Sequence, residues 1–281
     1  MDWQYKRPES TDELLEALEE PGALIVCGGT DVMVKLRSGL VAPRALVDVS
    51  RLGALRGIRE EEDHVVIGAA TTESEALDSD IIRRRFPLLV AALEKLGSVQ
   101  IRNRGTLGGN LVNASPAADG VIPLLLHEAE VVLASRGGYR RMPVEEFVVA
   151  PGKTQLREAE YLQEIRVPVA GDDLIGRFHK VGRRRALTIA IASLGMLCAL
   201  REGRITWIRF AAGSVAPSPL RLREAEEILR DTVPDAACIA RAREAAEAAV
   251  SPIDDLRGPA TYRRTVIGRL VAAFLEELPD A

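Results

Sequence analysis

The chain has 281 residues, and its 47% hydrophobic and 28% charged residues exclude a disordered chain, a collagen-like repeat and a disulfide scaffold. Its 37 basic and 41 acidic residues give a net charge of −4, so no attraction to nucleic acid or to an anionic membrane is expected. No run approaches the roughly 18 apolar residues of a membrane span, and the N-terminus lacks a signal-peptide pattern, so we expect a cytoplasmic protein without a membrane span.

The first hundred residues predict short helices that alternate with short strands. A helix is expected at 11–20, because leucines and acids alternate at helical spacing there and Ser10 or Thr11 can cap it. Thr72 and Glu75 have the capping-box spacing, which marks the start of another helix. The other elements expected in this region are strands at 23–27, 45–49 and 64–68 and helices at 30–36 and 86–96.

The middle of the chain changes character at 105–120, which has no regular periodicity and is rich in Gly, Asn, Ser, Pro and Thr. Long irregular segments between apolar elements are often functional, so we expect a functional loop there. A helix at 121–127 and strands at 131–133 and 160–168 are expected to follow.

A polar break at 169–173 is a candidate domain boundary, and the residues beyond it predict a sheet packed by helices. Two strands, 188–200 and 205–210, are expected to be joined by a turn at Glu202-Gly203. Three helices are then expected at 222–230, 236–250 and 262–277, because apolar residues recur there at intervals of three or four.

The sequence gives no sign of a metal centre. Cys27, Cys198 and Cys238 are far apart, form no Cys-x-x-Cys pair, and are accompanied by only three histidines. No segment therefore has the ligand spacing of a zinc or iron–sulfur site. An odd number of separated cysteines fits a reducing compartment, and any redox cofactor is expected to be held without a metal site in this chain.

Gly28, Gly29, Thr30 and Asp31 stand where an apolar strand is expected to pass into a helix. Unpaired backbone N–H groups and the positive end of a helix can bind an anion there, and glycines allow a phosphate to approach the backbone. The structural alternative is a simple Gly-Gly turn in which Thr30 or Asp31 caps the helix. Taken alone, this segment does not separate the two interpretations.

A second segment of the same kind runs from Thr106 through Gly108, Gly109 and Asn110 to the polar residues at 113–119. Two phosphate-type loops suggest a dinucleotide that is held by both of them. The single Gly-x-Gly-x-x-Gly turn of a Rossmann domain is absent, so binding of the Rossmann type is not expected. The structural alternative is a surface Ω-loop without a ligand.

The order and separation of these segments resemble the FAD-binding, or medium, subunit of molybdenum hydroxylases, the xanthine dehydrogenase and carbon monoxide dehydrogenase family. The similarity extends over nearly the whole chain, and its most specific part is Arg104-Gly105-Thr106-Leu107-Gly108-Gly109-Asn110 with the Ala-Ser-Pro-Ala-Ala-Asp run at 114–119. Residues 26–31 resemble the first flavin loop of the family and 67–72 its second element. Thr188 is a departure, because many relatives have Asp at this place after the arginines.

The resemblance implies an α+β protein with a two-subdomain FAD-binding fold of the vanillyl-alcohol-oxidase or PCMH type. The FAD-binding domain would span 1–170, with subdomains at about 1–57 and 58–170. A C-terminal domain of antiparallel sheet packed by helices would span 171–281.

The resemblance also implies which residues bind FAD, and it implies no catalytic side chain and no metal ligand in this chain. An aromatic residue at the position of Phe178 would lie against the isoalloxazine ring. The implied cofactor-binding residues are Cys27, Gly28, Gly29, Thr30, Asp31, Val32, Thr71, Thr106, Gly108, Gly109, Asn110, Ser115, Asp119, Leu162, Phe178 and Lys180.

As a member of this family, the chain would be an electron-transfer subunit that works in a complex. A small subunit with 2Fe-2S clusters and a large subunit with the molybdenum cofactor would be its partners, in a dimer of heterotrimers. Electrons would pass through FAD to NAD, quinone or oxygen. The alternatives are a freestanding FAD-dependent oxidoreductase of the same fold and a scaffold subunit whose flavin site has decayed.

Overall fold

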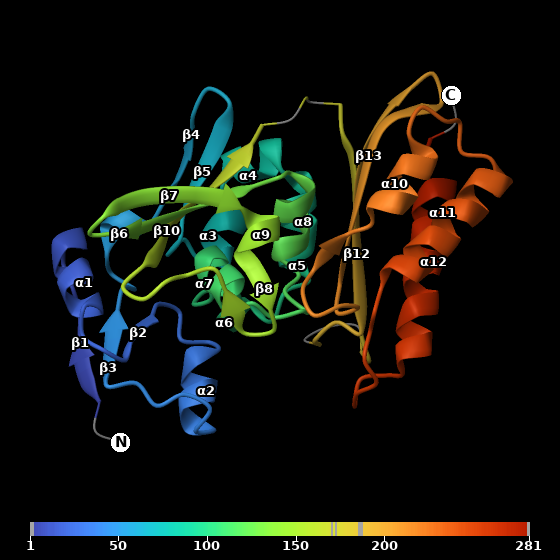
Figure 1. Cartoon of the computed structure of the whole chain (residues 1–281). Coiled ribbons are helices and arrows are strands. Elements are labelled where there is room, and N and C mark those ends of the chain that lie inside the picture. The colour runs from blue at the N-terminus through green and yellow to red at the C-terminus, as the bar shows by residue number, and fades with distance from the viewer. Residues whose placement is uncertain (1–2, 170, 172, 185–187, 280–281) are drawn as a thin grey trace.

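The computed structural model describes residues 3–169, 171, 173–184 and 188–279. Its main body has four layers, which run from left to right in Figure 1. A five-stranded sheet is followed by a layer of short helices, then by a four-stranded sheet and finally by the three C-terminal helices. A small three-stranded unit at the N-terminus lies below the first sheet. The mixed architecture agrees with the expected α+β class.

The N-terminal unit is a parallel sheet with strand order β1-β3-β2. Its helix α1 begins as the sequence predicts, because the hydroxyl of Ser10 accepts a bond of 3.2 Å from the backbone N–H of Glu13. Leu14 and Leu18 of this helix are buried against the sheet. The elements are β1 (Gln4–Lys6), α1 (Thr11–Leu18), β2 (Ala23–Val26), α2 (Val32–Arg37) and β3 (Ala45–Asp48).

The five-stranded sheet is antiparallel and has the strand order β4-β5-β10-β6-β7. The strand expected at 160–168 is its central strand, and the short strands at both edges lack a clear pattern in the sequence. The elements are β4 (Ile58–Glu60), β5 (His64–Gly68), β6 (Glu130–Ser135), β7 (Gly138–Pro143) and β10 (Tyr161–Pro168). The 3₁₀ helix η1 (Gly53–Leu55), α9 (Val144–Phe147) and the β8 (Val148–Ala150) and β9 (Lys153–Thr154) hairpin complete this part.

Short helices fill the space between the two large sheets. The capping box is confirmed, because the Thr72 hydroxyl accepts from the N–H of Glu75 and the Glu75 carboxylate accepts from the N–H of Thr72. Buried residues such as Phe86, Leu89 and Ile122 form the core of this layer. The helices are α3 (Glu73–Asp78), α4 (Asp80–Arg85), α5 (Pro87–Glu94), α6 (Val99–Arg102), α7 (Leu107–Val112) and α8 (Val121–Leu126).

The C-terminal sheet is antiparallel with order β11-β12-β13-β14, and three helices cover its outer face. Glu202 and Gly203 both have positive φ, 52° and 70°, as a tight hairpin turn requires. The strand expected from 188 begins only at Ala192, and residues 185–187 lie outside the described residues. The elements are β11 (Ile175–Val181), β12 (Ala192–Arg201), β13 (Arg204–Gly213), β14 (Leu220–Arg221), α10 (Arg223–Leu229), α11 (Ala236–Ala249) and α12 (Ala260–Glu276).

The inner face of this sheet packs directly on the helices of the first part. A Cβ atom added at Gly195 would lie 2.7 Å from Cγ2 of Ile122 and 2.9 Å from Cδ1 of Leu126, so only glycine lets α8 lie this close. Phe178 of β11 and Leu197 of β12 belong to the same core as α5 and α8. The C-terminal sheet thus packs closely against α5 and α8.

Within the residues that the structure describes, no helix is both long and apolar enough to cross a membrane. The fold therefore contains no helical membrane span in that part of the chain.

His127, at the end of α8, makes the stability of the fold sensitive to acid. Its buried ring packs edge-to-face on Phe86, with ring centroids 4.9 Å apart, and neither ring nitrogen has a hydrogen-bond partner in the described chain. Burial, with a smaller effect of Arg209, lowers the pKa of His127 to about 4. An unfolded chain has a histidine pKa of about 6.5, so the unfolded state takes up a proton first as the pH falls.

We expect the contribution of neutral His127 to be complete above pH 6.5 and to be lost as the pH falls toward 4. The loss between pH 7 and pH 5 is about 2 kcal/mol. His127→Phe keeps the apolar contacts and should remove this part of the pH dependence. Urea unfolding of both proteins at pH 5 and 7 measures it, and an unchanged pH dependence in the variant would contradict the assignment.

Candidate functional site

Three segments that are far apart in sequence lie in contact near the N-terminal ends of α2, α3 and α7. A Cβ atom added at Gly28 would lie 2.0 Å from the carbonyl oxygen of Arg104, so the first glycine loop touches the second segment backbone to backbone. The N–H of Glu73 donates to Gly105 O at 2.9 Å, and the N–H of Gly108 donates to Ala69 O at 3.1 Å. The structure therefore brings the two glycine segments together across the turn at 69–73.

The first segment, at the start of α2, keeps its backbone donors free. Gly29 has a φ of +75°, which glycine adopts readily. Asp31 occupies the N-cap position of α2, but its carboxylate accepts no capping bond. Within the described chain, the backbone N–H groups of Thr30, Asp31 and Val32 donate to no other protein group. The interpretation as a simple turn with a capped helix thus agrees only in part with the structure. Asp31 stands at the N-cap position, but its side chain makes no capping hydrogen bond.

The second segment contains a helix where the sequence predicts an irregular loop. The Thr106 hydroxyl accepts from the N–H of Gly109 at 3.0 Å and starts the six-residue helix α7. Glycine at two of its first three positions weakens the helical signal, which explains the wrong expectation. A Cβ atom at Gly109 would meet only the Thr106 hydroxyl, at 2.9 Å, so this face of α7 is otherwise open. The buried amide oxygen of Asn110 has no partner in the part of the chain described.

The polar run after α7 connects α2 with the C-terminal sheet. Lys35 Nζ of α2 donates to Asn113 Oδ1 at 2.7 Å, and the N–H of Ser214, after β13, donates to Pro116 O at 2.7 Å. The hydroxyl of Ser115 accepts from the N–H of Ala117 at 3.2 Å and closes a local turn. This run is therefore held at both ends and is not a free surface loop.

Asp119 and Lys180, which belong to different parts of the chain, form a buried ion pair. Lys180 Nζ lies 2.6 Å from Asp119 Oδ2, and the two side chains are 7% and 4% exposed. Burial raises the pKa of Asp119, and Lys180 partly offsets this effect. The other carboxylate oxygen, Oδ1, has no partner among the described residues. Lys180 also donates to Lys95 O at 3.0 Å, which ties β11 to the end of α5.

Several residues expected at the site lie in the interior in this conformation. Leu162 and Phe178 are buried members of the main core, and Lys95 Nζ lies 5.6 Å from the centre of the Phe178 ring. The Thr71 hydroxyl is bound to both the N–H and the carbonyl of Gly57. Burial raises the pKa of the half-buried Cys27 thiol, so this residue packs as a neutral thiol at neutral pH.

Sequence reasoning missed Glu73, whose carboxyl group lies against Gly105, just before α7. Its side chain is 3% exposed, and its Oε2 atom has no hydrogen-bond partner in the described chain. Burial, followed by the nearby charge of Asp31, raises the pKa of Glu73 to about 7. The capping box predicted a helix start here, and acids in a first helical turn are usually exposed, so no sequence signal marked its burial.

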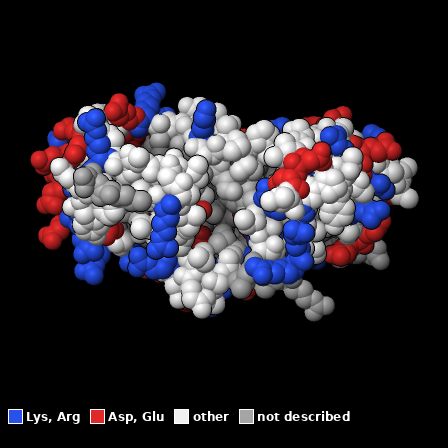
Figure 2. Space-filling model, turned by 90° about the horizontal axis from the view of Figure 1, so that it is seen from below, with Lys and Arg blue, Asp and Glu red and all other residues white. Residues whose placement is uncertain are grey.

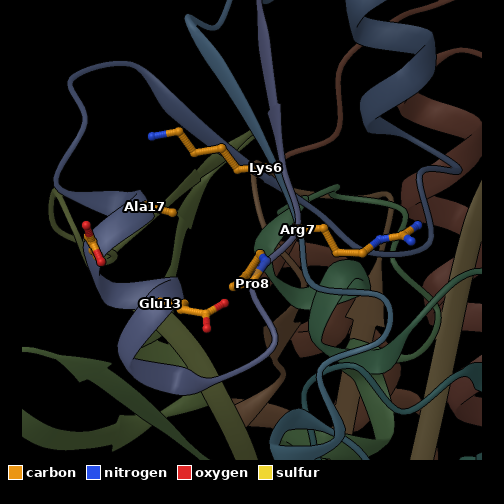
Figure 3. Close-up of a pocket in the computed structure, with 6 residues that line it drawn as sticks. Lys6, Arg7, Pro8, Glu13 and Ala17 are labelled. Carbon is orange, nitrogen blue, oxygen red and sulfur yellow. The ribbon is translucent and has the colours of Figure 1, made fainter.

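A separate cleft of about 220 Å³ lies beside α1 and is lined by Lys6, Arg7, Pro8, Glu13, Glu16 and Ala17. Figure 3 shows the side chains of Lys6 and Arg7 pointing to opposite sides. Arg7 is paired with Asp48 at 3.3 Å. None of the expected site residues lines this cleft. The view from below in Figure 2 shows a hollow near the middle of the molecule, in which acidic atoms are visible.

No group of three or more His, Cys, Asp or Glu residues in the described ranges is arranged to hold a metal ion. The backbone N–H groups, glycines and short polar side chains of the two glycine segments can bind an anionic ligand.

Comparison with known proteins gives a consistent result over the whole chain. A family model described as the FAD binding domain in molybdopterin dehydrogenase matches residues 1–170, and one described as the CO dehydrogenase flavoprotein C-terminal domain matches 177–278. The carbon monoxide dehydrogenase medium chain of Hydrogenophaga pseudoflava is 32% identical, over 97% of this chain and 96% of its own length. The xanthine dehydrogenase FAD-binding subunit of Escherichia coli O157:H7 is 30% identical, over 97% of this chain and 94% of its own.

Solved structures agree with these matches. A carbon monoxide dehydrogenase structure from Hydrogenophaga pseudoflava matches with a TM-score of 0.94 at 32% identity, covering 97% of this chain and 96% of that one. The structure of quinoline 2-oxidoreductase from Pseudomonas putida 86 matches with a TM-score of 0.93 at 25% identity, covering 98% and 96%.

Proposed function

The chain belongs to the family of medium, FAD-binding subunits of molybdenum hydroxylases, and we propose that it is the electron-transfer flavoprotein of a heteromeric dehydrogenase. It passes electrons from 2Fe-2S clusters of a partner subunit through FAD to NAD, quinone or oxygen. The observation that carries this proposal is the contact between the two glycine segments, which creates one anion-binding surface from residues about 80 positions apart.

The residues around this surface fit FAD. Its pyrophosphate needs donors and a close approach to the backbone, and the free N–H groups at 30–32 and the open face at Gly109 supply both. The unpartnered oxygens of Asn110 and Asp119 suit hydroxyl or N–H donors of the ribityl and ring parts. We therefore assign FAD to the surface formed by 28–32, 106–110 and 115–119.

When bound, FAD exchanges electrons, and the protein supplies its position and electrostatic surroundings. The side chains here bind and orient; no acid or base is required of them. The buried pair of Asp119 and Lys180 fixes the C-terminal sheet against the loop at 115–119 and keeps water out of this junction. Phe178 and Leu162 are buried members of the main core, so their part in this proposal is to support the site from within the core and not to contact solvent.

We further propose that the domain division follows the sheets. Residues 1–170 form the FAD-binding domain, with subdomains 1–57 and 58–170, and residues 171–281 form the C-terminal domain. The three-stranded, the five-stranded and the four-stranded sheet each lie wholly within one of these ranges, which supports the division.

The partners in this proposal are a small iron–sulfur subunit and a large subunit with the molybdenum cofactor, in a dimer of heterotrimers. The three widely separated cysteines of this chain are too few to bind such clusters, which supports their place in a partner subunit. The three free cysteines support a reducing compartment, and we propose the cytoplasm.

Gly109→Val tests the site. A valine there points into the open face of α7, where the pyrophosphate would approach, so we expect FAD affinity to fall at least about a hundredfold. The only protein atom that the new Cβ meets is the Thr106 hydroxyl, so the free energy of unfolding should change by only about 1 kcal/mol. Flavin absorbance after reconstitution with FAD and urea unfolding measure the two quantities. Equal FAD content in variant and parent would overturn the assignment of this loop.

A further inference from the structure

Glu73 is a buried acid beside the proposed FAD surface, and the proposed function gives it no role. It is the first residue of α3, and its backbone N–H donates a hydrogen bond to the carbonyl oxygen of Gly105. A Cβ atom added at Gly105 would lie 2.8 Å from Glu73 Oε2, so the carboxyl lies directly against the segment that precedes α7.

The charged groups that face this carboxyl do not neutralise it. Asp31, at the start of α2, adds a second negative charge nearby. Arg102, at the end of α6, is the nearby positive group, but its guanidinium donates to the carbonyls of Leu96 and Gly97 at 2.9 and 3.4 Å and makes no hydrogen bond to Glu73. On α3 itself, Glu75 is occupied with the capping box. An ionised Glu73 would therefore be a buried charge without a partner, which is costly.

A dianionic pyrophosphate bound at 28–32 and 106–110 would add negative charge on the side of this carboxyl where Asp31 already lies. Repulsion between the carboxylate and the phosphates is removed when the carboxyl carries a proton. We propose that Glu73 is a proton-linked positioning residue of the FAD site, whose carboxyl must be neutral for the pyrophosphate to be held tightly by the two glycine segments. This inference rests on the proposed function and assigns the site a pH dependence.

The direction of the effect follows from linkage. Burial and Asp31 already raise the pKa of Glu73 to about 7 in the free protein, and the phosphates raise this pKa further in the complex. FAD binding thus takes up a proton at neutral pH, and affinity is highest below the pKa of the free protein and falls as the pH rises above it. A shift of one pKa unit on binding corresponds to a tenfold change in affinity.

The test measures the FAD dissociation constant of the full chain by flavin fluorescence between pH 6 and pH 8. With a shift of one pKa unit on binding, we expect it to rise about fivefold in the parent protein, because the full effect is reached only above the pKa of the complex. Glu73→Gln has the same shape and is permanently neutral, so its constant should stay flat at the low-pH value of the parent. Asp78→Asn is the matched control, because it removes the same charge from the same helix at a side chain that is 81% exposed. This control should keep the rise seen in the parent protein.

Calorimetry in buffers of different ionisation enthalpy counts the protons directly. At pH 7, the parent and Asp78→Asn should take up a fraction of a proton on Glu73 for each FAD bound. In Glu73→Gln this uptake should be absent. FAD binding with the same pH profile in parent and Glu73→Gln would overturn the inference and leave the proposed function standing. Failure of all three proteins to bind FAD would overturn the proposed function and this inference with it.

Discussion

Replacing Gly28 with alanine is expected to lower FAD affinity about a hundredfold and to reduce the free energy of unfolding by roughly 2–3 kcal/mol. The new Cβ atom would lie 2.0 Å from the oxygen and 2.6 Å from the carbon of the Arg104 carbonyl. Both atoms belong to the backbone, so the clash can be relieved only by separating the two glycine segments. This separation would open the surface on which the pyrophosphate is proposed to bind.

Gly53→Ala is the matched control for this variant. A Cβ atom at Gly53 meets no atom within 4 Å, and Gly53 needs no positive φ, so the variant should keep both stability and FAD affinity. Urea unfolding of the FAD-free proteins and fluorescence titration with FAD give the two readings. Gly28→Ala with the affinity of the parent would mean that the contact between the segments is unnecessary for binding.

Local patterns in the sequence were enough to find the two glycine segments, but they did not show why each position requires glycine. The strand at 23–26 and the helix at 32–37 make the first turn visible, because both neighbours have clear patterns. The sequence alone suggested that all four glycines serve the approach of a phosphate. In the structure, Gly28 and Gly108 have a different role, because each has a backbone carbonyl, of Arg104 or Ala69, where a side chain would be. Such contacts join distant segments, and no local pattern encodes them.

The same limit explains the acid that was missed. Thr72 and Glu75 correctly predicted the start of α3, because a capping box is a local device. The burial of Glu73 depends on Gly105, more than thirty residues away in sequence, and on the start of α2. A helix start can thus be predicted from four neighbouring residues, whereas the charge state of a residue within it is set by packing.

The C-terminal sheet was only partly predictable for a related reason. The long hairpin of β12 and β13 was expected, because it has a clear apolar pattern and a turn at Glu202 and Gly203, which both have positive φ in the structure. Strand β11 was not expected, because its side chains contact the first part of the chain. Phe178 packs in the main core, and Lys180 pairs with Asp119. The resemblance selected these two residues, and their contacts with the first part of the chain are a result of the fold.

Lys180→Met is expected to destabilise the FAD-free protein by about 3–5 kcal/mol at pH 8, because it leaves the carboxylate of Asp119 buried and unpaired. Removing Lys180 also removes the group that holds down the already raised pKa of Asp119, so this carboxyl will become protonated at a higher pH. A carboxyl whose pKa is raised in the folded state costs least when it is neutral, and the loss should therefore shrink as the pH is lowered toward 5.

Adding Asp119→Asn to Lys180→Met should restore most of the lost stability, because the double variant buries no charge. The complete cycle of parent, two single variants and double variant, measured by urea unfolding at pH 5 and pH 8, isolates the coupling between the two side chains. The use of FAD-free protein separates this coupling from any effect on the cofactor. If Lys180→Met were as stable as the parent at both pH values, the buried pair would not hold the C-terminal sheet against the 115–119 loop in solution. The junction proposed to exclude water from the flavin would then have to be closed by the apolar contacts of α5 and α8 alone.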